Sequence, residues 1–272
     1  MAAALDEGRS LGGRTVLAIF AHPDDESLAC GGTLARLADL GARVILMCAS
    51  RGERGSVADP SLIPPGSTLG RVRSEEFREA ARVLGAAEAI ILDHPDGDLR
   101  WDHVDEFHEQ IVGAIRQYAP DLVITFAEDG LYWHLDHIGV HERTLTAIRS
   151  LGEAAPPLYY VTIPHGVMRK VVEAAVAKGW VPPGAGLWGI TADAFGIAAE
   201  PPSLTVDVGD WVPRKLAALR CHRTQMGANN PFARISDLEA RRWLGLELFR
   251  RAPTASRRES VLERLGEPVT SS

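Results

Sequence analysis

Strand-like and helix-like segments alternate along this 272-residue chain, and this alternation limits the possible folds more than any other feature. Short apolar runs, typical of buried strands, cover residues 15–21, 44–48, 89–92 and 122–126. Between them, apolar residues recur every three or four positions, as in amphipathic helices, over residues 27–40, 71–84, 102–118 and 137–150. The same alternation continues less clearly through residues 158–163, 167–178, 204–208 and 211–222.

Repeated strand–helix units form a mostly parallel sheet that is covered by helices on both faces. The sequence therefore predicts an α/β, Rossmann-like fold, with Asp102 and Asp136 as caps of two of its helices. No linker or internal repeat divides residues 14–250, so we expect a single domain there. Residues 1–13 are expected to be an N-terminal extension, and residues 251–272 a polar, partly disordered C-terminal tail.

The overall charge and the cysteine content restrict the cellular setting. A formal net charge of −7 argues against nucleic acid or an anionic membrane as a partner. No apolar run reaches the roughly 18–20 residues of a membrane helix, and Asp6 and Glu7 precede any apolar run, unlike a secretory signal. The three cysteines are widely spaced and form no CxxC pair, which is typical of reduced thiols. We therefore expect a cytoplasmic protein.

Polar residues follow each of the first four predicted strands. They lie in residues 22–26 (HPDDE), 50–55 (SRGERG), 93–98 (DHPDGD) and 128–137 (EDGLYWHLDH). In sheets of this type, ligands bind beyond the carboxyl ends of the strands, so the four loops should share one edge. Residues 179–203 are rich in Pro and Gly, and we expect them to form a loop or small lobe over that edge.

The first of these loops indicates a metal site. His22 and Asp25 lie three residues apart in a Pro-containing turn, close enough to bind one cation, which leaves Asp24 free to act as a base. Alternatively, His22 ends the strand and Asp25 caps the following helix. Adjacent carboxylates beside a histidine are harder to explain in that way, because like charges repel unless a cation offsets them. A third ligand would come from three histidines among which the spacing does not decide, namely His134, His137 and His141.

Residues 22–26 and 134–137 resemble the two signature motifs of the PIG-L/LmbE-like deacetylase family. Residues 50–55, 73–77 and 215–225 resemble three further motifs of that family, so the resemblance extends over about residues 14–250. The family includes zinc-dependent deacetylases of N-acetylglucosaminyl compounds in mycothiol, bacillithiol and GPI-anchor synthesis. One departure is Leu135, where the family usually has Pro; it is expected to loosen the loop without removing a reacting group.

The resemblance implies a zinc-dependent amidohydrolase that removes the N-acetyl group from an N-acetylglucosamine-type substrate and releases acetate. It implies that the zinc ligands are His22, Asp25 and His137, and that Asp24 is the general base acting on water. A site of His and Asp ligands also accepts Fe²⁺. The expected partner is a small amino-sugar substrate, and a homo-oligomer is compatible with the sequence.

The resemblance also implies roles for residues of the other motifs. His134 is expected to be the electrophile or acid that faces the substrate carbonyl, as an imidazolium whose pKa is raised by Asp136. Tyr132 is expected to help polarise the same carbonyl. Substrate contacts are expected from Arg73, Glu53 and Asp96.

Two alternative functions are compatible with parts of this pattern. A thiol-sugar S-conjugate amidase would use the same metal site with a larger pocket, and would release a larger acid than acetate. A non-catalytic sugar- or nucleotide-binding domain would share the fold. Asp24, His134 and Asp136 argue against the second alternative, because binding alone requires no base beside a metal.

Overall fold

One mixed sheet forms the centre of the computed structural model, which describes residues 10–57, 59–227 and 230–269. Its strands are β1 (Thr15–Phe20), β2 (Arg43–Ser50), β3 (Glu88–His94), β4 (Leu122–Phe126), β5 (Leu158–Thr162), β6 (Leu204–Asp207), β7 (Leu246–Arg251) and β8 (Glu267–Pro268). The order across the sheet is β3-β2-β1-β4-β5-β7-β6-β8. Strands β1 to β5 pair in parallel, whereas β6, β7 and β8 add an antiparallel edge. The predicted α/β fold is therefore confirmed.

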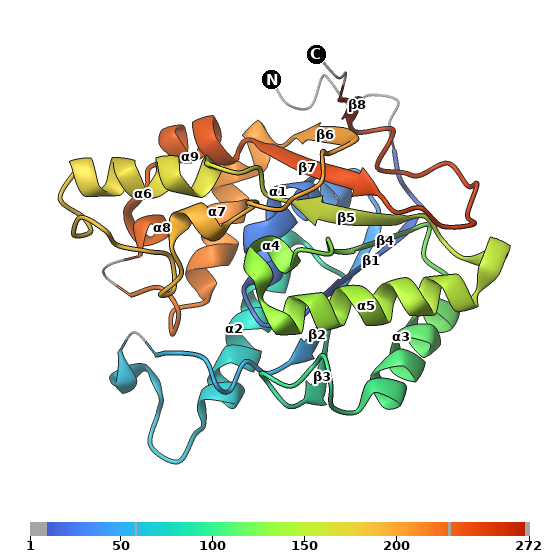
Figure 1. Ribbon diagram of the computed structural model, residues 1–272, viewed down its shortest axis with the longest axis horizontal. Helices are drawn as coiled ribbons and strands as arrows, with labels where there is room; N and C mark the ends of the chain where they lie inside the picture. The colour runs from blue at the N-terminus through green and yellow to red at the C-terminus, as the bar shows by residue number, and fades with distance from the viewer. Residues whose placement is uncertain (1–9, 58, 228–229, 270–272) are drawn as a thin grey trace.

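Helices cover both faces of the sheet (Figure 1). The described helices are α1 (Asp25–Asp39), α2 (Leu69–Leu84), α3 (Val104–Tyr118), α4 (Gly130–Trp133), α5 (Leu135–Ser150), α6 (Val167–Ala177), α7 (Val212–Cys221), α8 (Pro231–Arg234) and α9 (Asp237–Leu244). Helices α1, α2 and α7 pack together in one layer, and α3 packs against α5 in the other. None of these helices has the length and apolarity that crossing a membrane requires.

The central strands are buried on both faces, which explains their uninterrupted apolar sequences. All residues of β4, and all of β1 except Thr15, are buried. The register pairs Phe20 at the end of β1 with Cys48 near the end of β2, so the loops that follow these strands begin at the same edge. Phe20 and Phe126 pack edge to face at these strand ends, with ring centroids 5.1 Å apart, and form an apolar base under that edge.

Two predicted helix caps are wrong. Helix α3 begins after His103, whose backbone is in the left-handed region, rather than at Asp102. The N-cap of α5 is His134, whose Nδ1 accepts the backbone N–H of Asp136. Asp136 does not cap the helix because its carboxylate is bound elsewhere, by the backbone N–H groups of Gly97 and Leu99 and by His22.

The C-terminal segment differs from the expected polar tail. Residues 252–269 pack on the domain, with Val261, Leu262 and Leu265 buried. Strand β8 in this segment pairs with β6 at the antiparallel edge of the sheet. Four apolar residues of the segment, Ala252, Val261, Leu262 and Leu265, reach the core, which the average composition of the segment does not show.

Helix α1 is kinked at Cys30 (φ −147°, ψ 27°), and a buried carboxylate from β7 stabilises the kink. Glu247 accepts the backbone N–H groups of Gly32 at 3.0 Å and Thr33 at 2.7 Å, so it caps the second half of the helix. Lys215 of α7 donates to the same carboxylate at 2.6 Å. Any Cβ at Gly32 would lie 2.6 Å from the Val208 side chain, so this close approach requires glycine.

We expect Lys215→Met to lower the free energy of unfolding by about 3–5 kcal/mol, because it leaves the Glu247 carboxylate buried without its cation. Both side chains of this pair are at most 3% exposed. The matched control is Lys178→Met, which breaks the ion pair with Glu239 where the lysine side chain is 41% exposed, and it should change stability little. Urea denaturation measures both effects. Equal losses in the two variants would contradict this account.

Candidate active site

A cavity of about 320 Å³ lies at the carboxyl edge of the parallel strands. Each of the four polar loops contributes to its lining, as the sequence predicts: His22 and Asp24 follow β1, Arg54 follows β2, Asp96 follows β3, and His134 follows β4. Its volume is at the lower end of the roughly 300–1,000 Å³ that is typical of small-molecule sites. The edge therefore combines titratable side chains with room for a small ligand.

Three potential metal ligands meet at one side of this cavity. His137 Nε2 lies 3.3 Å from His22 Nδ1 and 3.2 Å from Asp25 Oδ1, and His22 Nδ1 lies 3.5 Å from Asp25 Oδ2. Zinc with four ligands at ~2.0–2.1 Å in a tetrahedron places neighbouring ligand atoms about 3.3–3.4 Å apart. His22 and His137 thus have the spacing of two zinc ligands, and Asp25 contacts each of them through a different carboxylate oxygen.

Hydrogen bonds to the other ring nitrogens fix both imidazoles. His137 Nδ1 donates to the backbone oxygen of Gly130 at 3.0 Å, which leaves the lone pair of Nε2 available to bind a metal. His22 Nε2 contacts carboxylate oxygens of Asp136 at 3.0 Å and Asp96 at 3.1 Å. Histidines that bind metals usually donate their second N–H in this way to a carboxylate or a backbone oxygen. The ring of Phe126 also stacks on His137, with centroids 4.1 Å apart.

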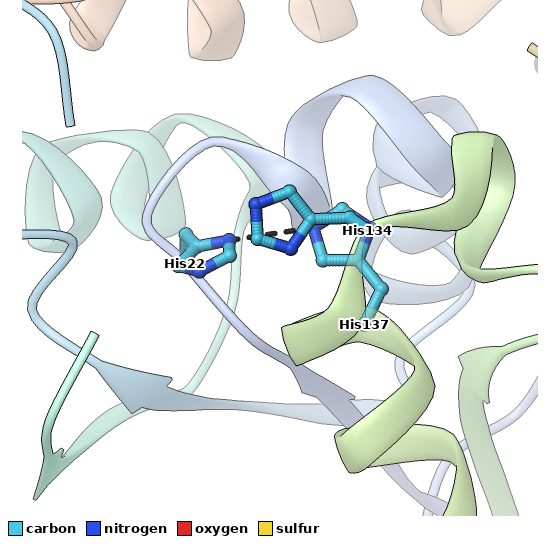
Figure 2. Close-up of side chains that lie close together, drawn as sticks. All are labelled: His22, His134 and His137. Carbon is cyan, nitrogen blue, oxygen red and sulfur yellow. Dashed lines mark hydrogen bonds between the residues drawn. The ribbon is translucent and has the colours of Figure 1, made fainter. Parts of the chain in front are cut away.

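Other donor groups overlap with this set. His22, His134 and His137 gather closely enough to bind an ion, as Figure 2 shows, and so do His22, Asp96 and Asp136. His134 Nδ1 already accepts the Asp136 N–H. His141, the third candidate from the sequence, is absent from the cavity lining, and its Nδ1 bonds to the backbone oxygen of Phe126 at 3.0 Å. Because His134 Nδ1 is already hydrogen-bonded and His141 lies outside the cavity lining, His22, Asp25 and His137 remain the ligand set that the family motifs indicate.

Negative charge surrounds His22. Burial lowers the pKa of its imidazole, but hydrogen bonds with Asp136, Asp25 and Asp96 outweigh burial and raise the pKa well above its ordinary value. Burial also opposes ionisation of Asp96, yet the hydrogen bond from His22 and the Arg54 backbone N–H hold its pKa at about 2. Three carboxylates around one imidazole form a suitable environment for a divalent cation.

Asp24 lies beside the donor set and lines the cavity. Its backbone has φ 113° and ψ −25°, a region that residues other than glycine rarely adopt and that costs on the order of 1–3 kcal/mol. This turn separates two adjacent carboxylates: both border the cavity, but Asp25 contacts His22 and His137 whereas Asp24 contacts Arg73. Burial raises the pKa of Asp24 to about 6, although the nearby Arg73 lowers it. A carboxylate with such a pKa is suited to act as a base near neutral pH.

Arg73 is 4% exposed, and three protein oxygens surround its guanidinium. It donates to the backbone oxygens of Pro23 at 2.7 Å and Gly52 at 2.8 Å, and to Asp24 Oδ2 at 3.3 Å. A Cβ atom at Gly52 or Gly55 would collide with the guanidinium, which explains both glycines of the second loop. Arg73 also lines the cavity, where the resemblance implies a substrate contact. In addition, it holds the Asp24 carboxylate in place.

Tyr132, just before the second signature motif, also lines the cavity. Leu131 and Trp133 both have positive φ, 68° and 65°, and they flank Tyr132, whose ring packs on His137 with centroids 5.2 Å apart. Burial raises the pKa of Tyr132 well above its ordinary value, so its phenol stays protonated and can donate a hydrogen bond. Strained backbone at two neighbouring residues is typical of functional sites.

The expected charge pair of His134 with Asp136 is not formed. The Asp136 carboxylate is bound to His22, Gly97 and Leu99, while His134 Nδ1 accepts the Asp136 backbone N–H. Burial, together with the nearby His137 and His22, lowers the pKa of His134 to about 4. The lowered pKa and the accepted N–H favour a neutral imidazole with its proton on Nε2 over the imidazolium that the resemblance implies.

The other candidate substrate residues differ in position. Asp96 lines the cavity, whereas Glu53 does not, and its carboxylate accepts the Asp96 backbone N–H at 2.9 Å. The segment 179–203 lies over the site as expected, and contributes Trp188 and Ile190 to the cavity wall. Gln225, in the last motif, also lines the cavity. That motif could have indicated Gln225 in advance, whereas no pattern in the sequence singles out Ile190.

Comparisons with known proteins agree with this geometry. The family described as PIG-L, GlcNAc-PI de-N-acetylase, matches residues 17–148. A relative from Acidothermus cellulolyticus, named 1D-myo-inositol 2-acetamido-2-deoxy-alpha-D-glucopyranoside deacetylase, is 30% identical over 87% of this chain and 88% of its own length. A relative of the same name from Geodermatophilus obscurus is 31% identical over 87% of this chain and 91% of its own length.

Solved structures show the same fold. N,N′-diacetylchitobiose deacetylase from Pyrococcus horikoshii has a TM-score of 0.62 and 22% identity, covering 88% of this chain and 84% of its own. A 4-carboxy-2-hydroxymuconate hydratase from Pseudomonas putida has a TM-score of 0.61 and 20% identity, covering 88% and 96%. Because this fold occurs in enzymes of different chemistry, the sequence relatives and motifs decide the family. The chain belongs to the PIG-L family of metal-dependent deacetylases.

Proposed function

We propose that this protein hydrolyses the N-acetyl group of a 2-acetamido-2-deoxyglucoside and releases acetate, using zinc held by His22, Asp25 and His137. The observation that carries the proposal is the position of Asp24, a carboxylate whose pKa is raised to about 6, directly beside three buried metal donors at the cavity wall. The names of the sequence relatives support an acetamido sugar joined to a polyol as the substrate class.

In this reaction a bound zinc ion would polarise the amide carbonyl and lower the pKa of water. Asp24 accepts the proton of the attacking water, and the Arg73 guanidinium keeps its carboxylate aimed at the cavity. After the attack Asp24 carries this proton beside the scissile bond, where it can pass to the leaving amine. The strained backbone at Asp24 keeps this carboxylate out of the donor set, so that it remains available as a base.

Tyr132 and His134 supply neutral hydrogen-bond donors in the cavity wall, beside His137. The phenol of Tyr132 and the Nε2–H of His134 can both donate to the oxygen that becomes negative during the attack. Donors that are fixed before the reaction stabilise the transition state more than the substrate, and so contribute to kcat. Asp96 at the cavity wall is positioned to accept from a sugar hydroxyl, and Asp136 to orient His22.

We expect purified protein to bind about one zinc ion per chain, and His137→Ala or Asp25→Ala to lose it. Asp96→Asn changes a carboxylate that contacts His22 without belonging to the proposed set, so zinc affinity should fall only about 10–100-fold. Equilibrium dialysis with metal analysis measures these affinities. Full zinc retention in His137→Ala, with complete loss in Asp96→Asn, would instead assign the metal to the group of His22, Asp96 and Asp136.

Asp24→Asn should keep zinc and lose about 10²–10⁴-fold in kcat, because the amide cannot accept a proton. The assay follows acetate release from a panel of N-acetylated amino-sugar glycosides. The control Glu79→Gln breaks an exposed ion pair with Arg223 and should leave kcat unchanged. Release of a larger acid from thiol-sugar S-conjugates alone would favour the conjugate amidase. Zinc binding without any acid release would favour a binding domain.

A further inference from the structure

The buried carboxylate of Glu26 holds the peptide group that precedes Asp24. Glu26 is fully buried, and its Oε2 accepts the backbone N–H of Asp24 at 3.1 Å. Its Oε1 accepts two further hydrogen bonds, from Ser27 Oγ at 2.5 Å and from His222 Nε2 at 2.9 Å. Three donors therefore converge on a side chain that lines neither the cavity nor the metal donor set.

His222 comes from a distant part of the chain. It lies at the C-terminal end of α7, is fully buried, and bonds to Glu26 across 196 residues of sequence. Its other ring nitrogen, Nδ1, has no hydrogen-bond partner among the described residues. Within the described chain, the imidazole of His222 therefore makes a single hydrogen bond, from Nε2–H to Glu26.

The backbone around Asp24 is thus fixed on two sides. Glu26 binds the N–H of Asp24, and Arg73 binds the carbonyl oxygen of Pro23, which belongs to the same peptide group. This peptide leads into the residue with φ 113°, and its orientation decides where the two adjacent carboxylates point. If the peptide rotates, Asp24 leaves the cavity wall or Asp25 leaves the histidines.

We propose that Glu26 and His222 form a positioning pair, in which His222 orients the Glu26 carboxylate and Glu26 holds the strained Asp24 peptide in its reactive geometry. The proposal rests on the proposed role of Asp24 as the base. Neither residue touches the substrate: the pair acts through Asp24. Loss of the His222 N–H should therefore misplace the base while the three metal donors stay bound to zinc.

The single contact of His222 permits a sharp comparison of variants. The side-chain amide of Gln can place an N–H near the position of Nε2, so His222→Gln keeps a donor to Glu26, whereas His222→Leu removes it. A second pair of variants, Glu26→Gln and Ser27→Ala, tests the same carboxylate. Gln at position 26 has one acceptor oxygen and an NH₂ group that cannot accept, so at least one of the three donors loses its partner, whereas Ser27→Ala removes a donor and leaves the other two bonded.

The matched control is His141→Leu. His141 is also buried, also makes one ring hydrogen bond, to the backbone oxygen of Phe126, and is absent from the cavity lining. It reports the general effect of replacing a buried histidine by an apolar side chain. Zinc content, Tm, kcat and KM are measured for all variants with the glycoside that gives the fastest acetate release.

We expect His222→Leu to lose about 10–100-fold in kcat, with one zinc per chain and an unchanged KM, because a small displacement of a reacting group has effects of this size. His222→Gln should regain most of that loss, and Glu26→Gln should lose more than Ser27→Ala. His141→Leu should lower Tm and leave kcat unchanged. Equal kcat in His222→Leu and His141→Leu, or zinc loss in His222→Leu, would overturn the proposal.

A readout without catalysis separates this proposal from the proposed function. In protein labelled with ¹⁵N-aspartate, the Asp24 amide bound to a carboxylate should exchange slowly with solvent. His222→Leu should speed up that exchange and shift the resonance, and His222→Gln should restore both. If the wild type releases no acid while the Asp24 amide shows this behaviour, the function fails and the positioning pair stands. An Asp24 amide that is unaffected by His222→Leu would overturn the pair whatever the activity.

Discussion

Crowding of carboxylates at one edge of the sheet is the constraint on which the site depends. Asp24, Asp25, Asp96 and Asp136 meet there with Glu26, at positions that are buried or nearly so. Like charges at such short range destabilise one another unless cations and N–H groups offset them. The protein provides Arg73 from α2, His222 from α7, His22 itself, and backbone N–H groups of the loop after β3.

Each carboxylate has different neighbours, and these neighbours separate the roles. Asp25 faces two histidines, and their charges, opposing its burial, hold its pKa well below the ordinary range. Asp24 faces one arginine, and burial outweighs the effect of that arginine, so the pKa of Asp24 rises to about 6. Asp136 contacts the second ring nitrogen of His22 and so orients that candidate metal ligand. In the proposed function, four identical functional groups thus provide a ligand, a base, an orienting group and a substrate contact by position alone.

The sequence predicted the features that depend on local pattern. Buried parallel strands leave uninterrupted apolar runs, so β4 was predicted residue for residue and β1 within one residue. Strand β7 was missed because Glu247 and Arg250 interrupt its apolar pattern. Converging strand ends bring His22, Asp25 and His137 together as expected. The partner of Asp136 could not be predicted, because His22 lies 114 residues earlier and only the folded sheet brings them together.

Glu247, which caps the second half of α1, has a consequence for how the protein is made. The candidate metal ligands are complete once residue 137 has been synthesised, but the carboxylate that fixes α1, the helix that begins at Asp25, follows only in β7. At about 5–20 residues per second, the ribosome needs on the order of 5–20 s to reach it. During that interval the candidate ligand Asp25 lies at the start of a helix that lacks its final cap. The final geometry of α1, and of the candidate site at its N-terminus, is therefore reached only in the last third of translation.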